Sequence, residues 1–275
     1  MHTPVEITAA ISKTGKAKAE TPLLKGFIKG ILSGVFLSFG GCFALTTAGA
    51  APPAYQKILL GAVFPVGLCL IVFTGMELFT GNNLFMTVAL LDKKCKVKDL
   101  LINWCSSFIG NFIGSLLVSY FLVYLADIPI TTGAWAEYTR NLGYGKINNA
   151  WSDNFLRAIS CNMLVCLALF LANSADDAVS KIVCIFLPIW AFVTSGFEHS
   201  VANMFFIPTA LFLGIDANWG KFLYNNLLPV TLGNIVGGSL FVGAIMWYLY
   251  SYDGKKKIAD APLDDSAMFP VNVQI

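Results

Sequence analysis

The stretch Gly196-Phe-Glu-His-Ser-Val-Ala-Asn-Met204 places a carboxyl group and an imidazole side by side, at Glu198 and His199. The residues around it are otherwise as apolar as those of a membrane-spanning helix. His199 is one of only two histidines in the chain, and the other, His2, stands next to the N-terminus. Because an ionisable side chain inside a span is costly, its presence there indicates a functional site.

The composition is typical of a membrane protein. Of 275 residues, 56% are hydrophobic and 12% are charged, whereas about a quarter of the residues in a soluble domain are charged. Long stretches contain no Asp, Glu, Lys or Arg, and a membrane span needs roughly 20 apolar residues. We therefore predict an all-α membrane protein with six transmembrane helices, at 27–50, 55–74, 100–125, 154–174, 179–196 and 226–250.

The distribution of lysine and arginine predicts the orientation of these spans. If the spans alternate in direction, thirteen of the eighteen Lys and Arg residues fall on one side. Cytoplasmic loops carry such an excess, so we expect a multi-pass protein of the cell membrane with both termini in the cytoplasm. The thirteen lie in the N-terminal segment, in the 92–99 loop, at Lys181 and at Lys255, Lys256 and Lys257.

A single transmembrane channel domain is expected over residues 1–253, followed by a disordered cytoplasmic tail over 254–275. The cytoplasmic segment 1–26 lacks the features of a signal peptide, and a short helix is expected along the membrane face over 4–19. The segment 126–153 is expected to be an outer loop. The seven cysteines match no zinc spacing, so no metal site is predicted.

Three patterns recur once each, in the same order and at nearly constant spacing. The pattern G-x-E-x-x-x-x-N begins at Gly75 and again at Gly196, 121 residues later. The pattern G-N-x-x-G begins at Gly110 and again at Gly233, 123 residues later. A weaker match of an aromatic, an aliphatic and a basic residue precedes both, with a spacing of 128 residues. These matches predict a duplicated three-helix unit, with halves at 27–125 and 154–250.

A unit with an odd number of spans must insert in the opposite direction when it is repeated. The two halves are then related by a pseudo-two-fold axis in the membrane plane, as in transporters whose binding sites lie near the midplane. Each G-x-E pattern precedes an apolar run too short to cross alone, at 84–91 and 204–213. We therefore predict broken second and fifth helices, whose loops are braced by Glu77, Glu198, Asn82 and Asn203.

His199 is the leading candidate for a residue that contacts a substrate. Its repeat counterpart is Leu78, so the imidazole is unique to one half. A histidine can donate a hydrogen bond when neutral and offer charge or a proton when protonated. Thr80, in the equivalent loop, is expected to face His199 across the axis, and Asn162 is another polar residue in an apolar span. A histidine that only satisfies a buried carbonyl is the plainer alternative.

The segments GFEHSVANM (196–204), GMELFTGNN (75–83) and LLPVTLGNIVGG (227–238) resemble the formate/nitrite transporter family. The motifs occur in the family's order, and the resemblance covers essentially the whole chain. It implies an aquaporin-like fold and a homopentamer with one pore in each protomer. It also implies transport of formate, nitrite, hydrosulfide or, in some members, lactate.

The same resemblance assigns roles to individual residues. It implies that His199 is the central pore histidine, that Thr80 lies beside it and that Asn162 is a pore residue. It implies that Lys146 is a vestibule lysine that attracts anions. The hydrophobic constrictions that it implies are formed by Phe64, Phe79, Phe192, Leu68 and Leu78, although any single phenylalanine could equally belong to the core.

The resemblance implies a channel or transporter for small monovalent weak-acid anions, most simply formate, with hydrosulfide, nitrite, lactate or acetate as alternatives. A bare anion in hydrocarbon carries a cost of order 20 kcal/mol before relaxation. As water is removed, the neutral acid becomes the cheaper species. Passage is therefore expected to be coupled to a proton, which comes from His199 or from bulk water. No catalytic residue, cofactor or nucleic acid is expected, and the lipid bilayer is the other partner.

Three other functions are compatible with parts of the sequence. A neutral-solute channel of the aquaporin kind shares the three-plus-three layout, but its two Asn-Pro-Ala signatures are absent from this sequence. A membrane-embedded enzyme that uses Glu198, His199 and Ser200 would need a nucleophile facing its base, whereas adjacent helical residues diverge by about 100°. A cation carrier that uses Glu77 and Glu198 would be driven by sodium or a metal ion.

Overall fold

The computed structural model describes residues 1–252, and their regular elements are helices. Within these residues, five helical stretches are long and apolar enough to cross a membrane. This confirms the prediction of an all-α protein. The five are α2 (Leu23–Gly49), α3 with α4 (Pro53–Val63, Pro65–Thr74), α6 with η1 (Val97–Leu117, Val118–Leu125), α8 (Trp151–Ala172), and α11, η3, α12, η4, α13 and η5 (Trp219–Lys221, Phe222–Leu227, Leu228–Ile235, Val236–Ala244, Ile245–Trp247, Tyr248–Tyr252).

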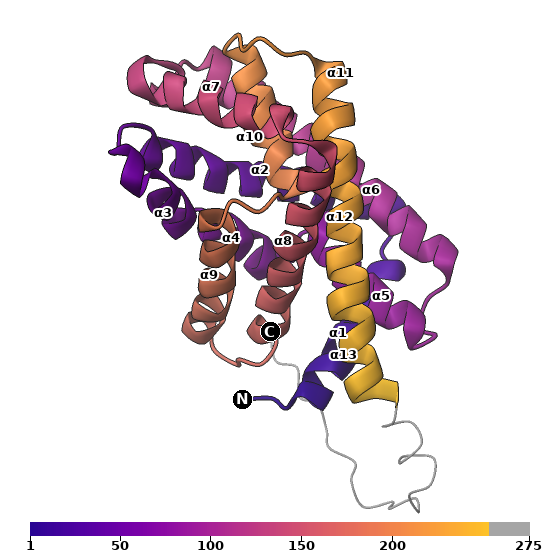
Figure 1. The fold of residues 1–275 in the computed structure, drawn as a ribbon. Helices are drawn as coiled ribbons and strands as arrows, with labels where there is room; N and C mark the ends of the chain where they lie inside the picture. The colour runs from indigo at the N-terminus through magenta and orange to yellow at the C-terminus, as the bar shows by residue number, and fades with distance from the viewer. Residues whose placement is uncertain (253–275) are drawn as a thin grey trace, which may run out of the picture.

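The two ends of the helix bundle form opposite faces (Figure 1). Helix α1 (Pro4–Ala19) lies across one end, which we call the N-terminal face, and Ser12 on it donates a hydrogen bond to Asp92. Helix α7 (Gly133–Asn148) lies across the other end, which we call the α7 face. There the indole of Trp135 donates to a backbone carbonyl near the end of α2.

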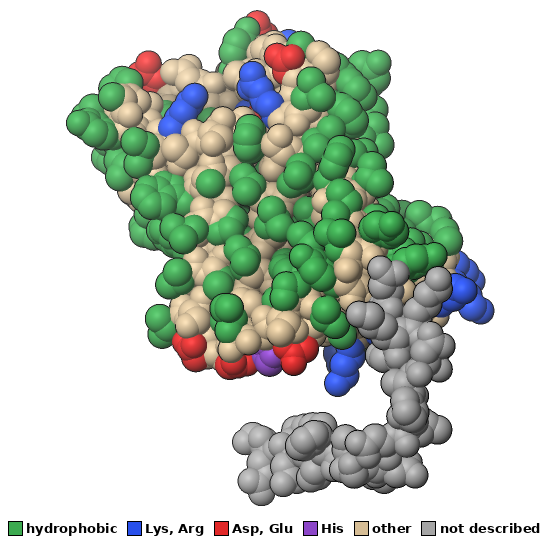
Figure 2. Space-filling model, turned by 60° about the horizontal axis from the view of Figure 1, so that its bottom comes forward, with side chains coloured by type: hydrophobic (Ala, Val, Ile, Leu, Met, Phe, Trp, Pro, Cys, Tyr) green, Lys and Arg blue, Asp and Glu red, His purple; other side chains and the backbone are tan. Residues whose placement is uncertain are grey.

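Apolar side chains cover the middle of the bundle, and charged side chains gather towards its two ends (Figure 2). Many of the exposed side chains along the long helices are Leu, Ile, Val, Phe and Tyr. A continuous apolar belt between charged ends suits contact with lipid rather than with water. The molecule therefore has the surface of a multi-pass membrane protein.

The long helices cross closely at glycines. A Cβ atom at Gly34 of α2 would lie 2.2 Å from the carbonyl oxygen of Asn111 in α6. A Cβ atom at Gly237, in the C-terminal stretch, would lie 2.2 Å from the carbonyl oxygen of Ile159 in α8. Both contacts require a residue without a side chain, as in other helix pairs of membrane proteins.

Two short apolar helices, α5 (Phe79–Leu91) and α10 (Ser200–Phe212), begin inside the bundle. Each follows a few non-helical residues that come after another helix, α4 or α9 (Ala178–Thr194). Both turns contain a glycine in the left-handed region, Gly75 with φ 67° and Gly196 with φ 73°. Glycine adopts this conformation without the steric cost that other residues carry, so the chain can turn sharply at both places.

The arrangement of six spans as an inverted repeat stays a prediction. The predicted fifth span, 179–196, corresponds to α9, which has 17 residues and is shorter than the five long stretches. The chain leaves helical conformation at both predicted breaks, near Gly75 and Gly196.

The segment 126–153, predicted as an outer loop, is mostly helical. A short 3₁₀ turn, η2 (Pro129–Thr131), leads into α7. The helix forms because its small residues let it pack on α10, for example at Gly143 against Ala210. Helix α1 coincides with the helix expected over 4–19. The predicted disordered tail, 254–275, lies outside the described residues.

Candidate functional site

The first turns of α5 and α10 meet inside the bundle, at Thr80 and His199. Nε2 of His199 lies 2.9 Å from Oγ1 of Thr80. Both residues are buried, and His199 is the N-cap of α10. Because a helix N-terminus carries a partial positive charge, two of them close together favour an anion at this point.

The hydrogen bonds of His199 define which nitrogen carries the ring proton. Nδ1 accepts a hydrogen bond from the backbone N–H of Ala202, at 3.0 Å. A nitrogen that accepts has no proton, so the neutral ring carries its proton on Nε2. Nε2–H then donates to Oγ1 of Thr80. The hydroxyl proton of Thr80 is left free to donate to a third group, such as an oxyanion.

Two asparagines complete the backbone hydrogen bonding at the breaks. Oδ1 of Asn111 accepts from the N–H of Phe79 at 2.9 Å, and its Nδ2 donates to the carbonyl of Glu77 at 2.9 Å. Oδ1 of Asn234 accepts from the N–H of Ser200 at 2.8 Å, and its Nδ2 donates to the carbonyl of Glu198 at 3.0 Å. Buried backbone groups need such partners because lipid offers none.

Sequence reasoning missed this role for Asn111 and Asn234. Both belong to the repeated G-N-x-x-G pattern, 123 residues apart. An asparagine repeated inside an apolar helix was the available signal, since such a side chain needs buried partners of its own. Asn82 and Asn203, which were predicted to brace the loops, donate hydrogen bonds to the carboxylates of Glu77 and Glu198.

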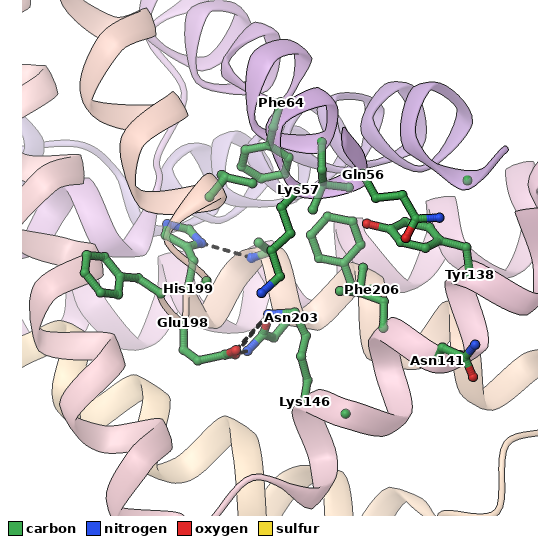
Figure 3. A pocket seen from close by; sticks show the side chains of 18 of the residues that line it. Gln56, Lys57, Phe64, Tyr138, Asn141, Lys146, Glu198, His199, Asn203 and Phe206 are labelled. Atoms are coloured by element: carbon green, nitrogen blue, oxygen red, sulfur yellow. Dashed lines mark hydrogen bonds and ion pairs between the residues drawn. The ribbon is translucent and has the colours of Figure 1, made fainter. Parts of the chain in front are cut away.

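Glu198 lies in a buried polar cluster (Figure 3). Nζ of Lys146 lies 3.0 and 3.1 Å from its two carboxylate oxygens. Nδ2 of Asn203 donates to it at 2.6 Å. The side chains of Lys146 and Glu198 are 15% and 3% exposed. Glu198 therefore compensates most of the charge of Lys146, the residue predicted to attract anions in the vestibule.

The first half contains an equivalent cluster around Glu77. Nζ of Lys18 lies 2.9 Å from its carboxylate, and Nδ2 of Asn82 donates to it at 2.8 Å. Asn103 adds a longer contact of 3.2 Å. Sequence reasoning missed Lys18, although its spacing of 128 residues from Lys146 equals that of the weakest repeat match.

A cavity of about 750 Å³ opens on the α7 face and reaches His199. Phe64, Phe192 and Phe206 line it close to the imidazole. The ring centroid of Phe64 lies 6.2 Å from that of Phe192 and 5.9 Å from that of Phe206. The ring of Phe192 stacks on that of His199 with a centroid distance of 5.8 Å. Aromatic rings thus separate the open part of the cavity from the Thr80–His199 contact.

A second cavity, of about 340 Å³, opens on the N-terminal face. Leu68, Leu78 and Phe85 form part of its apolar lining. Three cations, Lys18, Lys29 and Lys181, also line it, whereas Glu77 is the one acidic residue in its lining. The candidate site therefore consists of two cavities on opposite faces, with the buried Thr80–His199 contact between α5 and α10.

Two further residues of the predicted pore, Phe79 and Asn162, contact other helices. The ring of Phe79 packs edge-on against Trp104 and Phe108 of α6, with centroid distances of 6.2 and 5.1 Å. Nδ2 of Asn162 donates to the carbonyl of Thr80 at 3.2 Å and to that of Asn234 at 2.7 Å. Like Thr80, neither residue belongs to the lining of the two cavities. Asn162 thus supports the first turn of α5, which carries Thr80, through its backbone carbonyl.

The chemistry available at this site is hydrogen bonding rather than nucleophilic attack. Oγ of Ser200 is buried without a hydrogen-bond partner among the described residues, so no base activates it. Over residues 1–252, no group of three or more His, Cys, Asp or Glu side chains is placed to hold a metal ion. The hydroxyl of Thr80 and the imidazole of His199 form a neutral donor pair.

Comparison with known proteins gives a consistent picture. The family model described as formate/nitrite transporter matches residues 5–248. A probable formate transporter of Methanothermobacter thermautotrophicus is 44% identical over 266 residues, which cover 90% of this chain and 96% of the relative. The formate channel BtFdhC of Bacillus thuringiensis is 38% identical over 252 residues, with the same two coverages.

Two solved structures share the fold. One, described as an FNT family ion channel, superposes with a TM-score of 0.81 at 26% identity and covers 90% of this chain and 98% of its own. The other, described as a pentameric formate channel with formate bound, superposes with a TM-score of 0.73 at 32% identity. It covers 83% of this chain and 97% of its own.

Proposed function

This chain belongs to the formate/nitrite transporter family, and we propose that it is a channel for small monovalent weak-acid anions, with formate as the first substrate to test. Two relatives named for formate, at 44% and 38% identity, support that choice. Hydrosulfide, nitrite and lactate or acetate are alternative substrates. The cell membrane is the proposed location, with both termini in the cytoplasm.

The proposed architecture is an inverted three-plus-three repeat, in which α5 and α10 complete the broken second and fifth spans. The paired glycines, glutamates and asparagines at the two breaks support it. We further propose a homopentamer with one pore in each protomer. The description of a 32% identical solved chain as a pentameric formate channel supports this assembly.

Conduction begins with an anion that enters a cavity from either face. The apolar lining formed by Phe64, Phe192 and Phe206 on one side, and by Leu68 and Leu78 on the other, excludes water. A bare anion there carries an unfavourable solvation energy of order 20 kcal/mol before relaxation. The substrate therefore takes up a proton and crosses as the neutral acid.

At the centre, the Thr80 hydroxyl donates to an oxygen of the substrate while Nε2–H of His199 holds that hydroxyl in place. A second proton on His199 would have to sit on Nδ1, which caps α10 by accepting from Ala202. The arrangement thus favours a histidine that orients Thr80, with the travelling proton supplied by water at the cavity.

The buried 2.9 Å contact between Thr80 and His199, placed between two cavities, is the observation that carries this proposal. Its test is formate flux into proteoliposomes containing the purified protein and a pH-sensitive dye. A formate gradient is expected to acidify the lumen, and His199→Phe is expected to lower the rate at least tenfold.

Empty liposomes provide the background in this experiment, and osmotic swelling in glycerol tests the neutral-solute alternative. Formate entry without lumenal acidification would contradict proton coupling. Wild-type rates equal to background for formate, nitrite, hydrosulfide and lactate would overturn the proposed function.

A further inference from the structure

A fourth repeated pattern lies on the two surface helices. Gly15-x-x-Lys18 on α1 and Gly143-x-x-Lys146 on α7 are 128 residues apart. Each helix precedes one half of the predicted repeat and lies across one face of the bundle (Figure 1). The lysine of each pattern pairs with the glutamate at the break that follows it, at 2.9 Å for Lys18–Glu77 and 3.0 Å for Lys146–Glu198.

The glycine of each pattern lies against a short internal helix. A Cβ atom at Gly143 would lie 2.3 Å from Cβ of Ala210 in α10. A Cβ atom at Gly15 would lie 2.7 Å from Cβ of Ala89 in α5 and 2.1 Å from the carbonyl oxygen of Phe85. Ala89 and Ala210 are 121 residues apart, the same spacing as the two break glutamates.

The glycine and the lysine therefore work together. They are three residues apart, about one helical turn, so both project from the same side of their helix. The glycine lets the surface helix come close enough for the lysine to reach a buried carboxylate. At the start of α10 that carboxylate belongs to Glu198, which precedes the helix and stands directly before its N-cap residue, His199.

We propose that Gly143 and Lys146 form a clasp that positions His199, and that Gly15 and Lys18 form the same clasp for the first half. The inference deepens the proposed function and rests on it, since it assigns positioning residues to the same pore. Gly143 acts through α10 and Glu198, and it has no contact with a substrate.

The test adds one methyl group at two neighbouring glycines of α7. Gly143→Ala must push α7 from α10 by about 1 Å to reach ordinary contact. A Cβ atom at Gly145 would meet nothing within 4 Å, so Gly145→Ala is the matched control on the same helix. Since displacements of about 1 Å at a site are costly, we expect the maximal formate flux of Gly143→Ala to fall about tenfold, with Gly145→Ala unchanged.

A rescue separates the clasp from general destabilisation. Gly143→Ala combined with Ala210→Gly moves the methyl group across the interface and restores the space. The double variant is expected to regain most of the wild-type flux, and Ala210→Gly alone is expected to resemble wild type. The half-saturating formate concentration and its dependence on salt should stay unchanged throughout, because Lys146 acts here as an anchor. Failure of the rescue, or equal flux in Gly143→Ala and Gly145→Ala, would overturn the clasp.

A second measurement does not depend on transport. Lys146 is 15% exposed in its ion pair, so its labelling by an uncharged amine reagent, read by mass spectrometry, reports whether the clasp is closed. Labelling of Lys146 is expected to rise several-fold in Gly143→Ala and to return to the wild-type level in the double variant. Labelling of Gly143→Ala at the wild-type level would contradict the clasp. If wild-type liposomes carry no formate, the proposed function fails, and this comparison still decides the clasp.

Discussion

His199 serves two purposes with its two nitrogens. Nδ1 caps α10 through the N–H of Ala202, and Nε2 contacts the hydroxyl of Thr80. An N-cap bond is worth about 1 kcal/mol of stability. The contact with Thr80 instead bears on the proposed conduction step, so the two purposes can be separated by substitution.

His199→Asn is expected to keep the cap and lose the contact with Thr80, because asparagine is a good N-cap residue with a shorter side chain. The thermal unfolding midpoint in detergent should stay close to wild type, while formate flux in proteoliposomes falls about tenfold. His199→Phe should lower both quantities. Wild-type flux in His199→Asn would show that the hydrogen bond to Thr80 is dispensable.

Thr80 can be tested with two substitutions of opposite chemistry. Thr80→Val keeps the shape and removes the hydroxyl, whereas Thr80→Ser keeps the hydroxyl and removes a methyl group. Loss of a hydrogen bond of about 1.4 kcal/mol corresponds to a tenfold change in rate. We expect about tenfold slower formate flux for the valine variant and near wild-type flux for the serine variant. Equal rates for the two variants would contradict a donor role.

At the scale of elements, the short helices α5 and α10 depend on side chains from other helices for their backbone hydrogen bonding. Asn234 of α12 contacts the N–H of Ser200 and the carbonyls of Ala158 and Glu198. Asn111 of α6 makes the equivalent three contacts in the first half. These two residues let a helix begin inside the bundle, where water is not available to its first N–H groups.

Asn234→Ala is therefore expected to be strongly destabilising. It leaves buried polar groups without partners, and each costs about 1–3 kcal/mol. At 2–4 °C per kcal/mol for a chain of this size, the thermal midpoint of the solubilised protein should fall by about 10 °C. Asn148→Ala, at an exposed position of α7, is the control and should change the midpoint little. A small effect of Asn234→Ala would mean that the backbone N–H and carbonyl groups at the break form hydrogen bonds with other partners.

At the scale of the whole molecule, the lining of each cavity contains three Lys or Arg side chains, opposed by Glu77 alone on the N-terminal face and by Glu137 and Glu198 on the α7 face. The cavity on the N-terminal face is lined by Lys18, Lys29 and Lys181 against Glu77. Lys29 and Lys181 have no ion-pair partner among the described residues. A concave surface with charges of mainly one sign raises the local concentration of counter-ions. The opening of this cavity should therefore attract the anionic substrate.

Neutralising Lys29 and Lys181 together by substitution with glutamine should raise the half-saturating formate concentration about threefold to tenfold from the N-terminal face at low salt. The effect should vanish near 1 M salt, where the screening length is about 3 Å. Flux measurements in liposomes of known orientation check this, with the α7 face as an internal comparison. Lys25→Gln removes an exposed charge near the same face and outside the cavity lining, and it should have no effect. A change of equal size from both faces would contradict a local attraction.

The class of this protein follows from its sequence alone. Long uncharged apolar stretches avoid water only in lipid or in a large core. They therefore predicted an all-α membrane protein. The repeated G-x-E and G-N-x-x-G patterns identified the two turns at Gly75 and Gly196 where the chain leaves helical conformation. The rare pair of Glu198 and His199 marked the centre of the candidate site. These inferences are local, since each depends on composition or on spacing along the chain.

The partners of those residues were decided by the tertiary structure. Lys18 and Lys146 lie in polar segments, and only the packing of α1 and α7 places each beside a buried glutamate. Phe79 and Asn162 both lie in apolar stretches, and only the crossing of helices turns the first towards α6 and the second towards the carbonyl of Thr80. Hydropathy and spacing record which residues are buried. The side chain that each buried residue contacts depends on how helices distant in the sequence pack together. Neither hydropathy nor spacing along the chain contains that information.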